Sequence, residues 1–190
     1  IKVQTDMKGA LTVKENCLLI AQQACYECSE LTSVTIPNSV KKIGSEVFRY
    51  CTSLTSVTLG NGLTDIGAYA FYGCSKLSAI VVPDSVTTIE SKAFEGCTAL
   101  TSAVIGNGVT LIGWNAFFMC YWLANIEIPK SVTSIGMNTF SFCTRLKNIY
   151  FCSNPTIGAD AIPSTATCHL ILDDENAMDF NVANTNTYAD

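Results

Sequence analysis

Apolar residues recur along the chain as a 23-residue repeat. Each unit carries a cysteine with a leucine three residues after it, and five of the units carry a phenylalanine three residues before the cysteine. Two apolar pairs complete the unit, as in Val34 and Ile36 followed by Val40 and Ile43. A period between about 20 and 50 residues is typical of solenoids and related repeat proteins. The periodic cysteines are Cys28, Cys51, Cys74, Cys97, Cys120 and Cys143.

The residues after each cysteine predict a short strand. In "LTSVTL" (54–59), Val57 and Leu59 alternate with Ser56 and Thr58, so one face of the strand points inward and the other outward. One such unit cannot bury its apolar side alone, and stacked units predict a parallel sheet. A shorter piece with Ala-Phe, as in "AYAFYGC" (68–74), predicts one or two helical turns on the opposite side.

A glycine follows the second apolar pair in most units, where the chain must turn, and Glu90 replaces it in one unit. Either this position does not require a positive φ, or the turn at Glu90 is strained. A slower rhythm has a period of two units. Pro37, Pro83 and Pro129 alternate with Gly60 and Gly106 at the same position. Duplication of a 46-residue pair of units accounts for this alternation.

The repeat predicts one solenoid domain over residues 1–173. It comprises a partial repeat over 1–30, five full repeats over 31–145, and a divergent C-terminal repeat or cap over 146–173. Residues 174–190 are expected to form a polar tail or cap. Terminal repeats are atypical because they cover the open ends of the core.

The units "IPNSVKKIGSEVFRYCTSLTSVTL" and "SVTSIGMNTFSFCTRLKNI" resemble the BspA-like (spirochaete-type) leucine-rich repeats, whose members carry IPxSVxxIGxxAFxxCxxLxxVxL in tandem. The resemblance covers roughly residues 20–172. It implies an α/β fold: a right-handed solenoid with a parallel sheet on its concave face and short strands, 3₁₀ or α turns on its convex side. It also implies a surface or secreted protein that binds host proteins, matrix or other cells, with no catalytic residue.

Composition narrows the range of partners. The net charge of −5 argues against nucleic acid, which needs a basic face. No run of about 18 apolar residues occurs, so no membrane span is expected. No catalytic or phosphate-binding motif occurs, so we expect neither enzymatic activity nor a cofactor nor a metal site.

The periodic cysteines predict a ladder of buried, unpaired thiols, because free cysteine behaves as a small apolar residue. Cys25 and Cys28 form a CxxC motif, which redox and zinc sites also use, but the repeat places both in core positions. Cys17, Cys152 and Cys168 lie off the ladder and have no assignment from the sequence. Unpaired cysteines favour a reducing compartment, whereas the family resemblance favours a cell-surface, secreted or periplasmic location.

Two surfaces are candidates for binding. The first is an aromatic patch of residues whose positions are mostly polar in the other units: Trp114, Phe118, Tyr121, Trp122, Met137 and Phe142. The second is the concave sheet face, where the outward strand positions become varied: Ala79, Val81, Ser102, Val104, Asn125, Glu127, Asn148 and Tyr150. The sequence therefore predicts a module that binds a host or matrix protein. A binder of a small hydrophobic molecule and a module that associates with its own copy are the alternatives.

Overall fold

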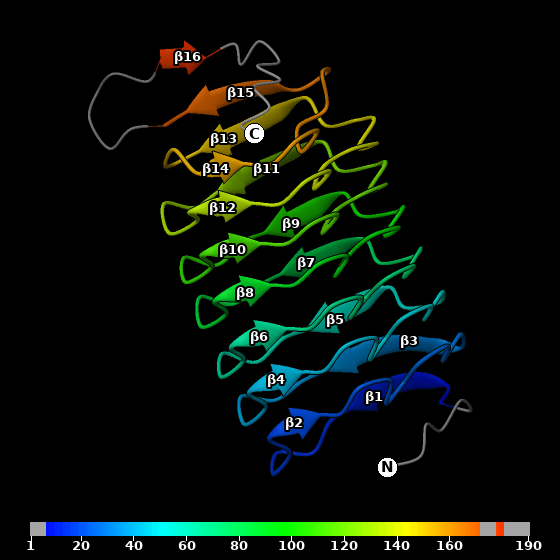
Figure 1. Cartoon of the computed structure of the whole chain (residues 1–190). Helices are drawn as coiled ribbons and strands as arrows, with labels where there is room; N and C mark the ends of the chain where they lie inside the picture. The colour runs from blue at the N-terminus through cyan, green and yellow to red at the C-terminus, as the bar shows by residue number, and fades with distance from the viewer. Residues whose placement is uncertain (1–6, 172–177, 181–190) are drawn as a thin grey trace.

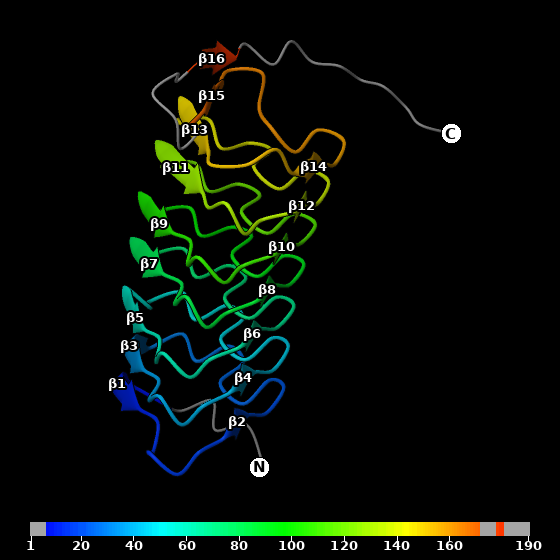
Figure 2. The ribbon, with the colours of Figure 1, turned by 90° about the vertical axis from the view of Figure 1, so that its left-hand side faces the viewer.

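The computed structural model describes residues 7–171 and 178–180, which form a stack of seven coils. Each coil contributes one longer and one shorter strand to two columns that run the length of the stack (Figure 1). Seen from the side, the two columns lie on opposite sides of the stack (Figure 2). The predicted parallel solenoid is confirmed. Of the expected tail or cap over 174–190, only 178–180 falls within the described residues.

The longer strands pair in parallel in three successive groups of three, two and three strands, and most paired residues are equivalent positions of consecutive repeats. They are β1 (Gly9–Thr12), β3 (Leu31–Thr35), β5 (Ser56–Thr58), β7 (Ala79–Val81), β9 (Ser102–Val104), β11 (Asn125–Ile128), β13 (Asn148–Phe151) and β15 (Thr167–Leu170). The strand β16 (Met178–Phe180) pairs antiparallel with β15 and so covers the last coil.

The shorter strands form one continuous parallel sheet of seven. They are β2 (Leu19–Ile20), β4 (Lys42–Ile43), β6 (Asp65–Ile66), β8 (Thr88–Ile89), β10 (Leu111–Ile112), β12 (Ser134–Ile135) and β14 (Thr156–Ile157). The alignment of "IGADAI" with "IGMNTF" is confirmed, because Ile157 of β14 pairs with Ile135 of β12.

The first coil begins with a strand that the repeat pattern did not predict. β1 pairs in parallel with β3, and Leu11 lies opposite Val34. The strand pairing at the two ends of the stack accounts for the positions of two cysteines that the sequence left unassigned. Cys17 lies one repeat before Val40, so it takes the place of a core valine at the half-buried end of the stack. Cys168 lies opposite Ile149 and is buried in the last coil.

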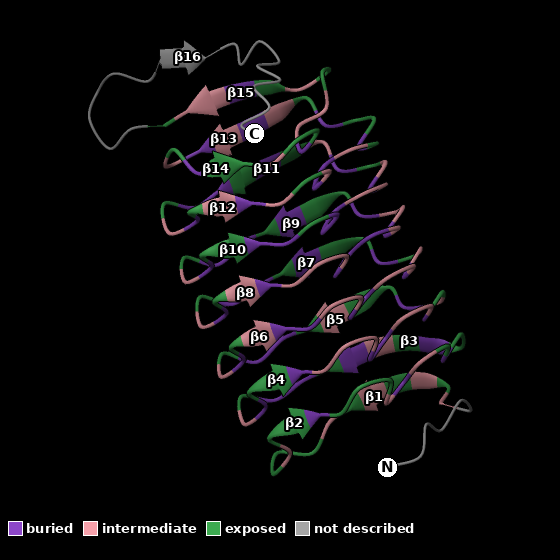
Figure 3. Cartoon of the chain, viewed as in Figure 1, coloured by how far each residue is buried: buried purple, intermediate pink, exposed green. Residues whose placement is uncertain are grey.

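The core is a set of columns, each built from one repeat position, and burial alternates along the strands as predicted (Figure 3). The phenylalanine column is the clearest case. The rings of consecutive coils lie 5.2–5.6 Å apart between centroids and are nearly parallel, with interplanar angles of 0–15°. Its five members are fully buried: Phe48, Phe71, Phe94, Phe117 and Phe140.

The expected helical turns are absent: the described residues contain no helix, and the α/β assignment is corrected to an all-β solenoid. The segment from Glu46 to Tyr50 makes consecutive turns instead, and both of these residues have φ near 60°. Positive φ recurs at the equivalent positions of the other coils. The first position is occupied by Gln23, Glu46, Tyr69, Lys92, Asn115, Asn138 and Asp160, and the second by Glu27, Tyr50, Gly73, Gly96, Met119 and Phe142.

The spacing of the coils explains why no helix forms. Backbone N–H groups of Glu46, Phe48 and Tyr50 donate to carbonyls of the next coil at 2.7–2.9 Å, as strands do. Hydrogen-bonded strands lie about 4.8 Å apart, whereas an α-helix is about 10 Å wide with its side chains. A helix in every coil would therefore spread the coils apart on this side and break the hydrogen bonds between the turn segments.

The cysteine column is buried, and none of the ten cysteines, all of which lie within the described residues, forms a disulfide. Five periodic thiols also donate hydrogen bonds to the coil before them. Cys74 Sγ lies 3.1 Å from the carbonyl oxygen of Phe48, and the same bond recurs at 3.1–3.3 Å for Cys51, Cys97, Cys120 and Cys143. Each of these carbonyls also accepts a backbone N–H, as Phe48 does from Cys51, so cysteine supplies a small apolar body and a second, weak donor to the same carbonyl.

Glycine is required where two loops nearly touch. A Cβ on Gly62 would lie 1.8 Å from the carbonyl oxygen of Asn38 in the coil before, and Gly108 faces Asp84 in the same way at 1.9 Å. The Asn38 side chain also accepts a hydrogen bond from the Asn61 N–H at 2.7 Å. The Gly-Asn-Gly loops thus rest closely on the preceding Pro loops, which gives the 46-residue rhythm a structural reason.

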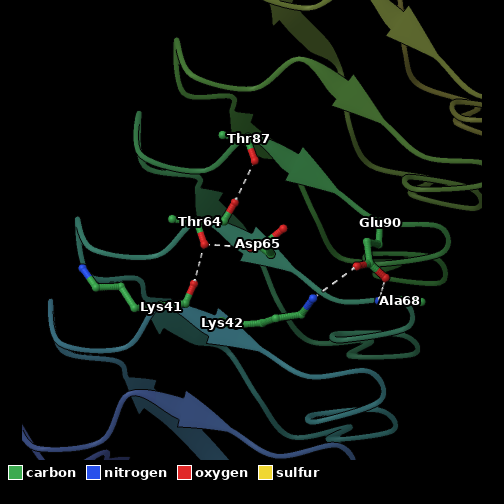
Figure 4. Close-up of polar contacts among 7 residues, drawn as sticks. All are labelled: Lys41, Lys42, Thr64, Asp65, Ala68, Thr87 and Glu90. Carbon is green, nitrogen blue, oxygen red and sulfur yellow. Dashed lines mark hydrogen bonds and ion pairs between the residues drawn. The ribbon is translucent and has the colours of Figure 1, made fainter.

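The structure also resolves the question raised by Glu90. The glycines at this position, such as Gly67, do not have positive φ; their space is occupied by the coil before, 2.7 Å from where a Cβ would lie. At Glu90 the carboxylate reaches back to the coil before, where it accepts a hydrogen bond from the Ala68 N–H at 3.0 Å, and it lies 3.9 Å from Lys42 Nζ (Figure 4). Thr64 and Thr87 beside it each donate to the carbonyl of the coil before.

The buried thiols predict a steep loss of stability at alkaline pH. Burial raises the pKa of Cys25 and of Cys143 to about 12 and that of Cys97 further, whereas an unfolded thiol ionises near pH 8.5. Above pH 9 the unfolded chain therefore binds fewer protons than the folded one. The free energy of unfolding should be constant up to about pH 8 and then fall by up to about 1.4 kcal/mol per pH unit for each buried thiol.

Urea unfolding followed by circular dichroism at pH 7 to 11 measures this loss. Cys97→Val removes one buried thiol, and its slope should be shallower than that of the wild type by about 1.4 kcal/mol per pH unit. Equal slopes for the two proteins would show that the thiols do not control alkaline stability.

The contact between loops predicts a second, local effect. Gly62→Ala should lower the free energy of unfolding by about 2 kcal/mol or more, because the new methyl group meets a backbone carbonyl that cannot move away. Asn61→Ala is the matched control: its side chain is exposed, its backbone N–H bond is kept, and its effect should stay within about 0.5 kcal/mol. Similar denaturation midpoints for the two variants would contradict this explanation.

Candidate partner-binding surfaces

The outward residues of the longer strands lie side by side on one surface, which we call the long-strand face. The pairing places Ala79 beside Ser102 and Val81 beside Val104. Val81 and Val104 are 60% and 52% exposed, so they form an exposed apolar pair in the middle of this face. The remaining predicted members continue it on β11 and β13: Asn125, Glu127, Asn148 and Tyr150.

The C-terminal part of the long-strand face is a polar track. Asn148 Nδ2 donates to Asn125 Oδ1 at 2.7 Å, and His169 Nε2 lies 3.0 Å from Asn148 Oδ1. The ring of Tyr150 stacks on that of His169 with centroids 4.8 Å apart. His169 was not recognised as part of this face from the sequence. Its outward position follows from the alternation with buried Cys168.

The predicted aromatic patch is divided between two segments. Trp114 and Phe118 lie on the turns that follow the short strands, and Phe118 packs edge-on against Phe142 of the next coil at 5.2 Å. Met137 is the counterpart of Trp114 one coil further on, and its carbonyl accepts a bond from the residue after Trp114. These turns stack along the right-hand side of Figure 1, and we call their outward surface the turn face.

Tyr121 and Trp122 lie beyond the buried Cys120, where the chain turns back toward the long strands. Tyr121 is half-buried, and Trp122 packs against the guanidinium of Arg145, whose Cζ lies 3.5 Å from the ring centroid. Trp122 therefore contacts a different neighbour from the Phe118 and Phe142 pair.

A cluster of tyrosines on the turn face was not predicted. The guanidinium of Arg49 lies 5.0–5.9 Å from the ring centroids of four tyrosines, Tyr26, Tyr50, Tyr69 and Tyr72. Its Nη1 also bonds Glu46 Oε2 at 2.8 Å. A half-buried cation held by several rings and a carboxylate is fixed in place, because each contact restricts the same planar group.

The cluster continues into the predicted patch. Lys92 Nζ lies 5.4 Å from the ring of Tyr69 and 5.3 Å from that of Trp114, so it links the two groups. Lys92 also pairs with Glu95 at 3.6 Å. We call the whole row the aromatic stripe; its ring members are Tyr26, Tyr50, Tyr69, Tyr72, Trp114, Phe118 and Phe142.

The sequence did contain a signal for the stripe. Tyr26, Arg49, Tyr72, Glu95 and Phe118 occupy the same repeat position in consecutive units. Read one unit at a time, this position is variable and mostly polar. Compared between consecutive units, it alternates between a ring and a charged group, and Arg49 makes cation–ring contacts with Tyr26 before it and Tyr72 after it.

Two hollows lie at the C-terminal end of the described stack. One, of about 370 Å³, is lined by residues that include Phe142, Asp160 and Ile162. The other, of about 250 Å³, lies beside His169 and Phe151. Ligand pockets usually measure about 300–1,000 Å³, so the first hollow lies at the low end of that range and the second lies below it.

Among residues 7–171 and 178–180, no cluster of three or more His, Cys, Asp or Glu side chains is arranged to hold a metal ion. The Cys25 thiol, half of the CxxC motif, is buried, and burial raises its pKa to about 12. A redox or metal-binding cysteine needs a lowered pKa, so the core interpretation of this motif holds. No helix within the same residues is long and apolar enough to cross a membrane.

The chain matches a family model described as BspA type leucine rich repeat region, in six copies, over residues 18–147 and 64–177. Among solved structures it is similar to a leucine-rich repeat protein of T. pallidum, with 28% identity and a TM-score of 0.73 over 83% of this chain and 81% of that one. No curated protein matches the chain significantly.

Two further solved structures share the fold. A leucine-rich repeat protein from Bacteroides ovatus aligns over 87% of this chain with 20% identity and a TM-score of 0.59. One from Eubacterium ventriosum aligns over 87% with 21% identity and a TM-score of 0.51. This chain spans about half the length of each of these two, 51% and 48%.

The tyrosine cluster predicts that Arg49 stabilises the turn face. Arg49→Ala removes four ring contacts and the pair with Glu46, and should lower the free energy of unfolding by about 1–3 kcal/mol. Arg49→Lys keeps the charge but not the planar group, so its loss should be smaller. Lys76→Ala, a change of an exposed cation, should stay within about 0.5 kcal/mol. Equal urea midpoints for Arg49→Ala and Lys76→Ala would contradict this role.

Proposed function

Because the chain belongs to the BspA type leucine-rich-repeat family, we propose that it is a non-catalytic module that binds a protein partner, such as a host or matrix protein. The binding surface is the predicted aromatic patch, which comprises part of the turn face and the adjoining segment of Trp122. Leucine-rich repeats are a general scaffold for protein interaction, and neither the family nor the similar structures indicate an enzymatic family. The solenoid supplies a rigid frame because the inward positions of each coil are fixed by packing.

The exposed aromatic and thioether side chains of two neighbouring coils carry this proposal. Trp114 is 49% exposed, Trp122 48%, Met137 51% and Phe142 59%. Large apolar side chains gathered on a soluble surface mark contact sites, and tryptophan and tyrosine dominate the energetics of protein interfaces. The partner would be held mainly by apolar and aromatic contacts, because Arg49 and Lys92 of the turn face are already paired.

We place the protein on the cell surface, in the secreted fraction or in the periplasm. BspA type proteins are often surface-associated or secreted, and this supports the location. The ten cysteines, none of which forms a disulfide, are compatible with it, because eight are buried and disulfide exchange needs an accessible thiolate. An oxidising compartment would therefore leave the ladder intact.

Self-association has one specific observation in its favour. Val81 and Val104 form an exposed apolar pair at the centre of the long-strand face, and a second copy of the chain could cover this pair. Sedimentation across a concentration range separates this function from binding to another protein: a chain that stays monomeric at all concentrations excludes it. The hydrophobic-ligand alternative rests on the hollow beside Phe142 and would show as a rise in melting temperature with fatty acids but not with sugars.

The proposed interface predicts that two substitutions separate binding from folding. Trp114→Ala combined with Trp122→Ser should weaken binding to purified extracellular-matrix proteins at least about tenfold in surface plasmon resonance, because interface tryptophans contribute about 2 kcal/mol or more. The melting temperature should change little, since both side chains are half exposed.

The matched control is Val81→Ser combined with Val104→Ser, which removes apolar area from the long-strand face and leaves the turn face intact. Loss of binding in this control, with full binding by the tryptophan variant, would show that the partner binds the long-strand face instead. Loss of the circular-dichroism signal in the tryptophan variant would show that its residues belong to the core.

A further inference from the structure

The aromatic stripe has a period of its own. Tyr26, Tyr72 and Phe118 occupy one repeat position in every second coil, and Arg49 and Glu95 occupy it in the coils between. Paired strands are spaced by about 4.8 Å, and the phenylalanine rings of consecutive coils by 5.2–5.6 Å. The three rings therefore recur about every 10 Å along the stack.

A polyproline II helix has nearly the same period. It has three residues per turn and a rise of about 3.1 Å per residue, so every third residue returns to the same side after about 9.3 Å. A segment in this conformation that runs along the stack can place one residue of each turn on Tyr26, Tyr72 and Phe118 in succession. The mismatch is about 0.3 Å per turn at the strand spacing and about 1–2 Å per turn at the ring spacing, which side-chain rotation can absorb.

The ring orientations favour this ligand over a flat one. Tyr26 and Tyr50 meet at an interplanar angle of 80°, and Tyr50 and Tyr72 at 90°. Perpendicular neighbours make a corrugated surface, whose grooves suit proline rings in the way that aromatic grooves hold proline-rich peptides. A glycan chain that stacks on aromatic side chains needs neighbouring rings that lie parallel to its sugars, and Tyr50 stands perpendicular to the ring on either side of it.

The charges of the stripe favour an uncharged ligand. Arg49 is paired with Glu46 and Lys92 with Glu95, so each cation of the stripe is neutralised within its own coil. A charged ligand would lose hydration without gaining an unpaired partner. The carbonyls of a polyproline II backbone have no internal partners, and the tyrosines and Trp114 carry the O–H and N–H groups that can donate to such acceptors.

Arg49 also makes the surface rigid before the ligand arrives. Its guanidinium lies against four tyrosine rings and Glu46, which limits the rotation of all of them. A polyproline II segment is likewise ordered when free. Binding between two preformed surfaces loses less conformational entropy than binding of a flexible loop.

We propose that the aromatic stripe binds an uncharged, proline-rich segment in the polyproline II conformation, with prolines at every third residue on Tyr26, Tyr72 and Phe118. This inference rests on the proposed function, in that the partner is a protein, and it specifies the conformation and spacing that the turn face recognises.

Fluorescence anisotropy with a labelled synthetic peptide tests the proposal on the whole chain. The probe is an uncharged peptide of about a dozen residues with proline at every third position, and it should bind with a Kd on the order of 10–500 μM. A peptide of the same composition with its prolines at every fourth position should bind at least about fivefold more weakly. This comparison needs no substitution in the protein, so it cannot fail through misfolding.

Protein variants locate the site. Tyr72→Ala should weaken binding of the probe at least about fivefold, because it removes the central ring. Tyr150→Ala removes an aromatic side chain from the long-strand face and should leave the Kd unchanged within about twofold. Equal binding of the two peptides, no saturation up to about millimolar concentration, or an unchanged Kd in Tyr72→Ala would each overturn the inference.

Other outcomes separate this inference from the proposed function. Binding of a β-1,4-linked glucose oligomer that Tyr72→Ala abolishes, with no binding of the peptide, would assign the stripe to glycans and overturn the inference. If a matrix protein binds the wild type and not the Trp114 and Trp122 double variant, while the peptide fails to bind, the inference fails and the proposed function stands. If neither a matrix protein nor the peptide binds, both fail.

Discussion

The hydrogen-bonded spacing between coils is the constraint on which the rest of this structure depends. Strand pairing holds the coils about 4.8 Å apart, and every other feature must fit that distance. The phenylalanine rings meet it by lying nearly parallel. The turn segments meet it by donating their N–H groups to the next coil, with residues such as Glu46 and Tyr50 in the left-handed region. The loops meet it by having glycine where the backbones are closest.

The periodic cysteines are a second consequence of this spacing. Where the turn segment ends, the carbonyl of the phenylalanine position is buried in the core. The cysteine of the following coil is small enough to fit beside that carbonyl and donates its thiol to it, as Cys74 does to Phe48. The same carbonyl also accepts the Cys51 N–H at 3.1 Å, so the thiol adds a second hydrogen bond to it, whereas valine or alanine would leave only the backbone one. The cysteine ladder is therefore structural chemistry repeated in each coil, and it does not compete with the surfaces for a functional role.

The repeat register predicted which side chains face inward, because burial follows directly from position within a repeat. It placed the phenylalanine and cysteine columns and the outward residues of the long strands correctly, down to the pairing of Val81 with Val104. It did not predict the backbone of the turns. A hydrophobic pattern does not indicate whether a glutamate or tyrosine has positive φ. The Ala-Phe pattern is also compatible with two backbone arrangements, one whose N–H groups bond within the segment and one whose N–H groups bond to the next coil. It also missed β1, where Leu11 keeps the register although the flanking residues depart from the consensus.

The tyrosine cluster shows why contacts between repeats are the hardest feature to read from such a sequence. Arg49 contacts rings of the coil before it and of the coil after it, so its environment appears only when adjacent units are compared column by column.

Packing fixes the inward columns, which leaves the outward columns free to vary at little cost to the fold. Duplication of a two-coil unit then spaces any outward ring at about 10 Å without further selection. Tyr26, Tyr72 and Phe118 lie in the coils that alternate with the Pro37, Pro83 and Pro129 coils, so one duplication produced both the loop rhythm and the period of the stripe. A binding surface with a regular spacing is therefore a direct product of the repeat that stabilises the fold.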